Sequence, residues 1–173
     1  MTWRGSSTTQ DRIFACLVYI VPVLEVLLIG FGEPLFRSIP YLRLAFVPLM
    51  PLLAIYAYSV GGIAVVQIAV FIGLFAGVIR NYRVVHFLRF HTMQALLIGI
   101  AIFLCDAVLS ILGIGRSVIG VGASPVEVLF WNPLMSVIFV AVLAAAIYSV
   151  VQSIRGLYAE LPIISEAAYQ FVR

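Results

Sequence analysis

Few side chains in this 173-residue sequence could do chemistry, and they fall into two groups. The first group is a cluster of basic, polar and aromatic residues between two apolar runs: Arg80, Asn81, Arg89, Phe90, His91, Met93 and Gln94. The second group is a pair of acids, Glu25 and Asp106, each inside an apolar run. Arginines and aromatic rings at a membrane surface suit lipid phosphates, a partner protein or a passing polypeptide, whereas acids within a membrane segment suit the lining of a polar pathway.

Other forms of chemistry are not indicated. His86 and His91 are five residues apart, which is poor spacing for metal ligands, and we expect both at the surface or the membrane interface. The glycine-rich stretch 113–122 lacks the strand and helix that flank a phosphate-binding loop. Asp106 is the only aspartate in any predicted span, which excludes a pair of catalytic aspartates within one chain. We therefore expect that the protein is not an enzyme and binds neither a metal nor a cofactor.

The composition places these residues in a chain that dissolves in lipid. Apolar residues make up 64% of the sequence and charged residues 10%, and the mean hydropathy is +1.19. A soluble domain is roughly 45–50% apolar and about 25% charged, so a soluble domain, a disordered tail and a nucleic-acid-binding module are excluded. All ten basic residues are arginine, and the net charge of +3 is too small to indicate an anionic partner.

The polar residues must be positioned by helices long enough to cross the bilayer. A helix needs about 20 mostly apolar residues to cross the hydrocarbon core. Four segments qualify: 13–31, 61–79, 92–112 and 134–154. We therefore predict a single transmembrane domain over 1–173, with an all-α four-helix bundle. On these bounds Gln94 lies in the first turn of the third span, within reach of Arg89 or another helix.

The segment 34–58 is apolar but interrupted. Arg43 lies within it, and Pro48 and Pro51 remove backbone donors from its middle. Its three tyrosines fit a position at the level of the lipid headgroups: Tyr41, Tyr56 and Tyr58. We interpret the segment as interfacial or re-entrant. The alternative is a fifth span, which would put the two termini on opposite sides of the membrane.

Arginine counts predict the orientation. Seven arginines fall on the side of both termini and of the loop between the second and third spans: Arg4, Arg12, Arg80, Arg83, Arg89, Arg155 and Arg173. Three fall on the other side: Arg37, Arg43 and Arg116. Because arginines accumulate on the cytoplasmic side, we predict that both termini are cytoplasmic. Glu25 and Asp106 then lie in the outer half of the membrane. Their alternative role is structural, with each acid protonated or hydrogen-bonded to a neighbouring helix.

Small residues recur at four-residue spacing in the second predicted span. Gly73 and Gly77 bound a small-xxx-small pattern there. Such a face lets two helices approach closely. The partner helix lies either within the same chain or in another copy, so the pattern leaves a homo-oligomer open.

The start of the third predicted span carries a motif that the bilayer alone does not require. It reads Arg89-Phe90-His91-Thr92-Met93-Gln94-Ala95, and the pair Arg80-Asn81 closes the second span. This stretch resembles the RF-[N/H]-x-MQA element of the twenty-kilodalton subunit family of the translocon at the inner chloroplast envelope, the Tic complex, and of its cyanobacterial relatives. Weaker matches follow in the family's order: Tyr19, Pro22, Pro40, Pro48, Pro51 and Leu161–Ala168.

The resemblance covers nearly the whole chain and implies a topology, a location and a role. It implies four spans with both ends on the stromal or cytosolic side, in agreement with the arginine count. It implies a component of a protein-conducting channel, with lipid, other translocon subunits and further copies as partners. The arginine-only composition and the short polar start, too short for a transit peptide, look like those of a cyanobacterial member in the plasma or thylakoid membrane. One departure is Gly99: many members carry an acid near it, and here the acid is Asp106, on nearly the same face.

Three functions remain open. The first is a protein-translocation channel component, but four helices with so few polar residues can hardly enclose a polypeptide, so an oligomer or a lateral groove is required. The second is an accessory or assembly subunit of a larger membrane complex. The third is a transporter of ions or small solutes, which usually shows internal repeats that this sequence lacks.

Overall fold

The computed structural model of the chain describes residues 8–111, 125–162 and 164–172. Within these ranges every regular element is a helix, apart from one isolated bridge between Val60 and Ile63. Three helices are long and apolar enough to cross a membrane: Thr9–Ile29, His86–Ile111 and Leu129–Arg155. The prediction of an all-α membrane protein is therefore confirmed by the length and composition of these helices.

The first long helix has two parts, α1 (Thr9–Val18) and α2 (Ile20–Ile29), which continue one another through Tyr19. Pro22 accounts for the break, because it offers no N–H to the carbonyl four residues earlier in the chain. The helix covers most of the first predicted span and begins four residues before it.

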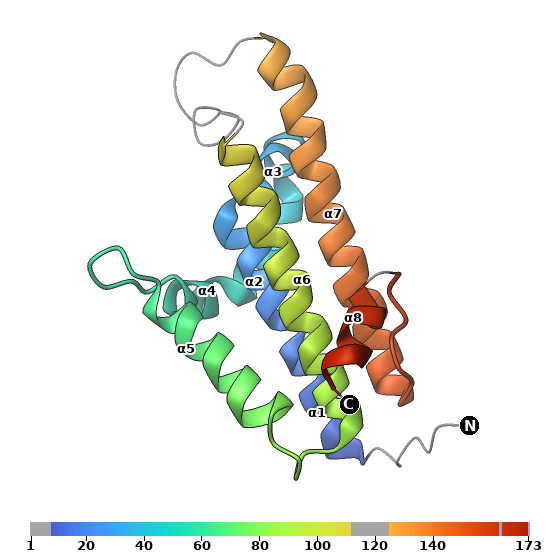
Figure 1. Cartoon of the computed structure of the whole chain (residues 1–173). Helices are drawn as coiled ribbons and strands as arrows, with labels where there is room; N and C mark the ends of the chain where they lie inside the picture. Colours follow the sequence, from blue (N-terminus) through green and yellow to red (C-terminus); the bar gives the residue numbers. More distant parts are fainter. Residues whose placement is uncertain (1–7, 112–124, 163, 173) are drawn as a thin grey trace.

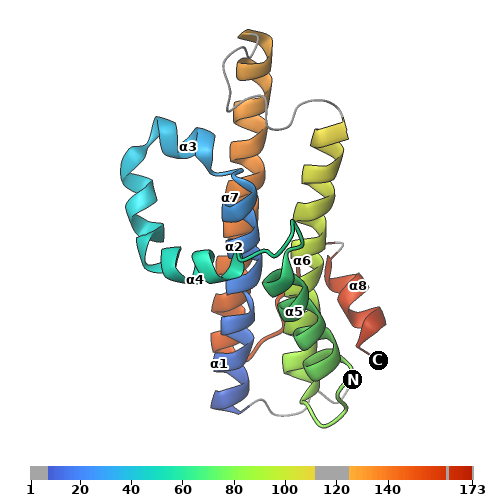
Figure 2. The same ribbon diagram turned by 90° about the vertical axis from the view of Figure 1, so that its left-hand side faces the viewer.

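Three short elements form an open ring beside α2 (Figure 2). They are α3 (Glu33–Ser38), the 3-10 helix η1 (Pro40–Leu49) and α4 (Met50–Tyr56). Pro48 lies inside η1 and Pro51 lies in the first turn of α4. Pro48 has no N–H to donate within η1, and Pro51 suits the first turn of a helix but not its interior, so the segment bends around the ring instead of crossing as one helix. Its interfacial or re-entrant position stays a prediction.

The second predicted span, 61–79, differs from expectation. Gly61 and Gly62 form a turn with φ of 59° and 83°, a left-handed conformation that glycine adopts without strain. The helix therefore starts late, as α5 (Val65–Leu74), and ends in a five-residue π-helical turn, η2 (Phe75–Ile79). At 1.5 Å per residue this gives about 22 Å, short of the ~30 Å core. Of the four predicted spans, three are long helices in the described chain.

The remaining helices are α6 (His86–Ile111), α7 (Pro125–Arg155) and the short α8 (Ile164–Phe171). The third predicted span began at residue 92, but α6 begins six residues earlier. Helix α7 likewise extends nine residues before the fourth predicted span and contains Pro133. Helix α8 packs against α6 (Figure 1).

The joined helices α1 and α2 run beside α6 and α7, and α5 slants away from them (Figures 1 and 2). The start of α1, the connection between η2 and α6, and the end of α7 share one end of the bundle, which we call the terminal end. Helix α3 and the start of α7 lie at the opposite, distal end. One buried apolar cluster joins α2, α3, α6 and α7, and includes Phe31, Ile102 and Phe139. A second joins α1, α6 and the C-terminal segment, and includes Phe87 and Val172.

Candidate functional site

The motif cluster lies at the start of α6 and in the connection before it, and most of it is buried. Five of its seven members are buried: Arg89, Phe90, His91, Met93 and Gln94. Two expectations are therefore wrong. His91 is fully buried rather than at the surface, and Gln94 lies in the third turn of its helix rather than the first. The reason is that α1, α7 and the C-terminal segment cover this part of α6.

Arg89 links the start of α6 to the end of η2. Its Nε donates a hydrogen bond to the carbonyl of Ile79 at 2.8 Å, and its guanidinium lies 5.3 Å from the centre of the Tyr82 ring. The carbonyls at the end of a helix carry partial negative charge, which suits a guanidinium at the end of η2. Arg80 is exposed and Asn81 is half-buried. The prediction that the cluster contacts a partner or a passing chain stays a prediction, and Arg80 is its most accessible member.

A buried hydrogen-bond network centres on Tyr19, between α1 and α2. The Tyr19 hydroxyl donates to Gln94 Oε1 at 3.0 Å and lies 2.8 Å from His91 Nδ1. Gln94 Nε2 donates to the Ala159 carbonyl at 3.0 Å, and the Ser153 hydroxyl lies 3.2 Å from His91 Nδ1. Interhelical bonds of this kind in membranes average about 0.6 kcal/mol each. The network joins α1, α6, α7 and the segment before α8.

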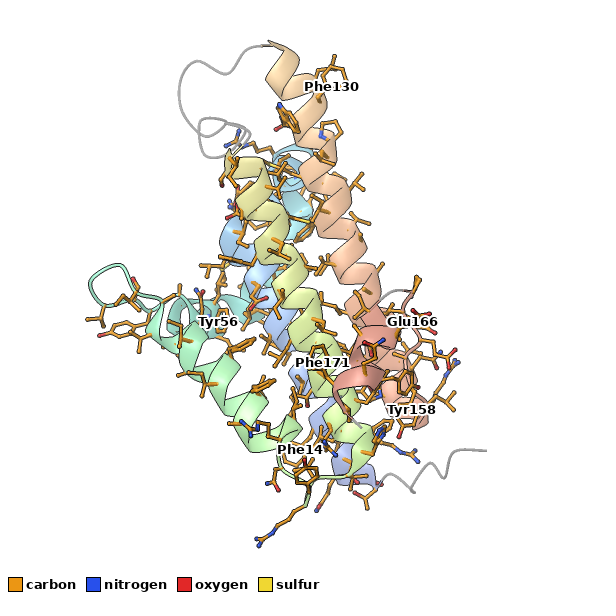
Figure 3. The ribbon with its side chains drawn as sticks, viewed as in Figure 1. Phe14, Tyr56, Phe130, Tyr158, Glu166 and Phe171 are labelled. Atoms are coloured by element: carbon orange, nitrogen blue, oxygen red, sulfur yellow. The ribbon has the colours of Figure 1, made fainter. Side chains whose placement is uncertain are left out.

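Aromatic packing completes the attachment of the C-terminal segment. The Phe90 ring centre lies 5.0 Å from that of Tyr158 and 4.5 Å from that of Tyr169. The Tyr158 hydroxyl lies 3.1 Å from His86 Nδ1 at the start of α6. Tyr158 lies three residues beyond the end of α7, near the start of α6 (Figure 3). The motif that the sequence singled out therefore holds the C-terminal segment to the bundle.

The distal half of the bundle contains a cavity of about 650 Å³ between α2, α3, α5, α6 and α7. Its polar lining consists of six residues: Glu25, Glu33, Arg37, Gln67, Asp106 and Asn132. The structure thus brings together Glu25 and Asp106, the two acids that the sequence placed within the membrane. The volume falls in the ~300–1,000 Å³ range of pockets that hold small ligands.

Glu25 forms part of the cavity wall and packs against α6. Its Oε1 accepts a hydrogen bond from the Tyr56 hydroxyl at 2.9 Å, while its Oε2 is buried with no hydrogen-bond partner in the described chain. The carboxyl group approaches α6 at Gly99, where a Cβ would lie 2.9 Å from Glu25 Cδ. The close approach therefore requires glycine. It also places the Glu25 carboxyl at the position on α6 where the family resemblance leads us to expect an acid.

The other charged side chains of the cavity differ in their partners. Glu33 Oε1 accepts a hydrogen bond from the Arg43 guanidinium at 2.7 Å, which is the one salt bridge within the described ranges. Arg37 lies on α3 with Glu33 and is exposed. Asp106 is half-buried and forms no hydrogen bond or ion pair with another described residue. Glu25 and Asp106 are thus the cavity's two carboxylates that lack a cationic partner in this part of the chain.

The small-residue face of the second predicted span is open. Gly73 and Gly77 are exposed, and a Cβ at either would meet nothing within 4 Å. No described helix of the chain packs on this face, because α5 slants away from the bundle (Figure 1). Close packing at these glycines within the molecule stays a prediction, as does packing between copies.

Two tyrosines have roles that sequence reasoning missed. Tyr56, expected at headgroup level, is only 4% exposed and bonds to Glu25, whereas Tyr41 and Tyr58 are 83% and 60% exposed. Tyr19 is 1% exposed and anchors the buried network. A buried tyrosine usually needs a hydrogen-bond partner for its hydroxyl group, so a tyrosine within an apolar run indicates a polar contact. The sequence does not identify the partner residue. No group of three or more potential metal ligands occurs among the described residues.

The sequence resembles known proteins along nearly its whole length. Residues 8–168 match a family model described as "Chloroplast import apparatus Tic20-like". A Tic20 family protein of Synechocystis sp. is 35% identical over 173 residues, which cover 100% of this chain and 99% of that protein. Protein TIC 20-II, chloroplastic, of Arabidopsis thaliana is 27% identical over 97% of this chain and 76% of its own length. Protein TIC 20-I, chloroplastic, of the same plant is 26% identical over 91% of this chain and 53% of its own length.

Proposed function

The chain belongs to the Tic20 family, and from this premise we propose that it is a subunit of a machinery that moves proteins across or into a membrane. The three long apolar helices support a multi-pass membrane location. The full-length similarity to a Synechocystis protein supports a cyanobacterial plasma or thylakoid membrane. The proposal assigns the chain no catalytic step, metal or cofactor, and no nucleic-acid partner.

We propose four crossings with both termini in the cytoplasm, the second crossing being broken. In this arrangement the ring of α3, η1 and α4 brings the chain inward from the distal end, and α5 with η2 returns it to the terminal end (Figure 1). Five arginines in elements of the terminal end support this orientation: Arg12, Arg80, Arg83, Arg89 and Arg155. The backbone N–H and carbonyl groups of the irregular segment between α4 and α5 would need hydrogen bonds from protein or water. This requirement favours contact with a partner subunit or a further copy.

The polar cavity is the observation that carries the proposal. Polar and ionisable groups within a membrane are unfavourable unless they meet water, one another or a polar ligand, and such groups mark pathways. Six of them line one volume in the distal half. The second apolar cluster and the buried motif fill the terminal half, so the described part of one chain leaves no continuous passage there. A channel therefore needs further copies or other subunits, and the open face at Gly73 and Gly77 is available to them.

Isolation in mild detergent, with identification of the bound proteins, tests this proposal. We expect other membrane subunits or further copies to co-purify, together with a precursor protein arrested during translocation. Arg80→Gln should reduce the recovery of partners, while Arg83→Gln, an exposed arginine of the same connection, serves as the matched control. A monomer free of bound protein under every mild condition would contradict the proposal.

An accessory or assembly subunit is the second candidate. The observation that favours it is the solid packing of the terminal half, where the motif serves internal contacts. Depletion of the chain separates the two functions. An accessory role predicts that other subunits are lost before translocation slows, whereas a direct role predicts that arrested precursors lose a contact with this chain while the other subunits remain.

A further inference from the structure

The charged side chains that line the cavity differ in their pairing. Glu33 is paired with Arg43, and Arg37 lies one turn further along α3. The other two carboxylates of the lining, Glu25 and Asp106, take part in no ion pair within the described chain. An intramembrane carboxylate without a partner is unfavourable, and a bound cation would relieve this.

One face of α6 connects the two acids. Gly99, Phe103 and Asp106 follow one another at spacings of four and three residues, so all three point to the same side of the helix. All three line the cavity, and Glu25 packs on Gly99 at one end of this row. The Phe103 ring is 66% exposed and lies between the two acids along the helix. An aromatic ring flanked by carboxylates is a favourable environment for an organic cation.

The Glu25 carboxyl group keeps one oxygen without a protein partner. Its Oε2 is buried with no hydrogen bond in the described chain and lies close to α6 at Gly99. The Tyr56 hydroxyl holds Oε1 from the other side. The amide side chains of Gln67 and Asn132 add one acceptor oxygen and one donor NH2 group each, and the Arg37 guanidinium adds further donors. The negative charge of Glu25 and Asp106 is therefore the feature of this lining that favours a cation.

We propose that this cavity binds a cationic side chain of a polypeptide, a guanidinium or ammonium group held between Glu25 and Asp106 over the Phe103 ring. The proposal rests on the proposed function, because a polypeptide in transit would supply such side chains. The amine headgroup of a lipid offers the same chemistry, and the experiment distinguishes the two sources.

The test measures binding to the purified full chain in nanodiscs of phosphatidylglycerol. The probe is a short peptide amide with one arginine and no other charge, and its control is the same peptide with neutral citrulline. We expect the arginine peptide to bind at least tenfold more tightly than the citrulline peptide. Glu25→Gln combined with Asp106→Asn should remove this difference, and Glu160→Gln, an exposed acid outside the cavity, should keep it.

Equal binding of the two peptides, or an unchanged difference in the double variant, overturns the proposal. Asp106→Asn alone guards against misfolding, because Asp106 is half-buried and makes no described bond, and it should weaken arginine binding at least threefold. Nanodiscs that contain phosphatidylethanolamine give the lipid arm. If phosphatidylethanolamine lowers the affinity of the unaltered chain for the arginine peptide tenfold, and does not do so for the double variant, the cavity binds a lipid amine. That result would also overturn the proposal.

The outcome separates this inference from the proposed function. Charge-dependent binding of the probe without any contact to translocating proteins in cells would refute the proposed function and leave a cation site. If the chain contacts translocating proteins but binds the arginine and citrulline peptides equally, only the inference about the cavity is refuted.

Discussion

The fit between Glu25 and Gly99 gives a prediction that can be worked through in detail. In Gly99→Ala the new methyl group would overlap the Glu25 carboxyl group. The overlapping atoms are the end of a flexible side chain, so the easiest relief is rotation of the carboxyl group into the cavity. That rotation breaks its 2.9 Å bond with the Tyr56 hydroxyl. Interhelical hydrogen bonds in membranes are worth about 0.6 kcal/mol on average and about 1.7 kcal/mol at most.

The expected magnitude must be corrected for helix propensity. Replacing glycine by alanine inside a helix is worth about 1 kcal/mol in favour of the helix. Gly73→Ala receives this gain without a clash, because nothing lies within 4 Å of its Cβ position. Gly99→Ala should therefore have a free energy of unfolding about 0.6–1.7 kcal/mol lower than that of Gly73→Ala. If the backbone must move as well, the difference rises to about 3 kcal/mol.

Unfolding by sodium dodecyl sulfate in mixed micelles, followed by circular dichroism, measures these differences. The decisive comparison uses a Glu25→Ala background, in which the overlapping carboxyl group is gone. There Gly99→Ala and Gly73→Ala should change the free energy of unfolding by the same amount within about 0.5 kcal/mol. A penalty at Gly99 that persists in the Glu25→Ala background would refute the packing of Glu25 on α6.

Three further variants test other parts of the structure. Gln94→Leu removes the bonds to Tyr19 and to the Ala159 carbonyl, so the free energy of unfolding should fall by about 1–3 kcal/mol and amide exchange in α8 should rise; unchanged exchange would contradict the anchoring role. Gly77→Leu adds bulk to the open face, so folding stability should not fall, with a gain of up to about 1 kcal/mol from helix propensity, while the oligomer recovered in mild detergent decreases; an unchanged oligomer would argue against that face. In a cysteine-free chain, Arg83→Cys should react only with reagents applied to the cytoplasmic side, and labelling from outside would refute the orientation.

Composition and apolar run length were sufficient to predict an all-α membrane protein, because both report directly on the solvent that surrounds the helices. They also placed Glu25 and Asp106 within apolar runs, and both acids line one cavity. Their proximity was not predictable, since it depends on how α2 packs against α6. The sequence marked Gly99, the glycine that permits this packing, only as a departure from the family pattern and not as a contact. Its importance follows only from the carboxyl group that faces it.

The misplaced residues have a common cause. The apolar-run criterion started the third span at residue 92, but protein rather than lipid buries the first two turns of α6. That criterion therefore predicts His91 and Gln94 near the surface, whereas both are buried. The same criterion counted 61–79 as a full span, because two glycines hardly change its mean hydropathy although they form a turn. Mean hydropathy does not report whether other helices bury a segment or whether the backbone turns within it.

Crosslinking from within the cavity tests the central claim most directly. A photoreactive phenylalanine analogue at position 103 lies in the cavity, whereas the same analogue at position 104 lies outside its lining, and the two native side chains are similarly exposed at 66% and 56%. With a precursor protein arrested in translocation, the account predicts a crosslink to the precursor from position 103 and none from position 104. Equal crosslinking from both positions, or crosslinks to lipid alone from position 103, would contradict a role for this cavity in protein translocation.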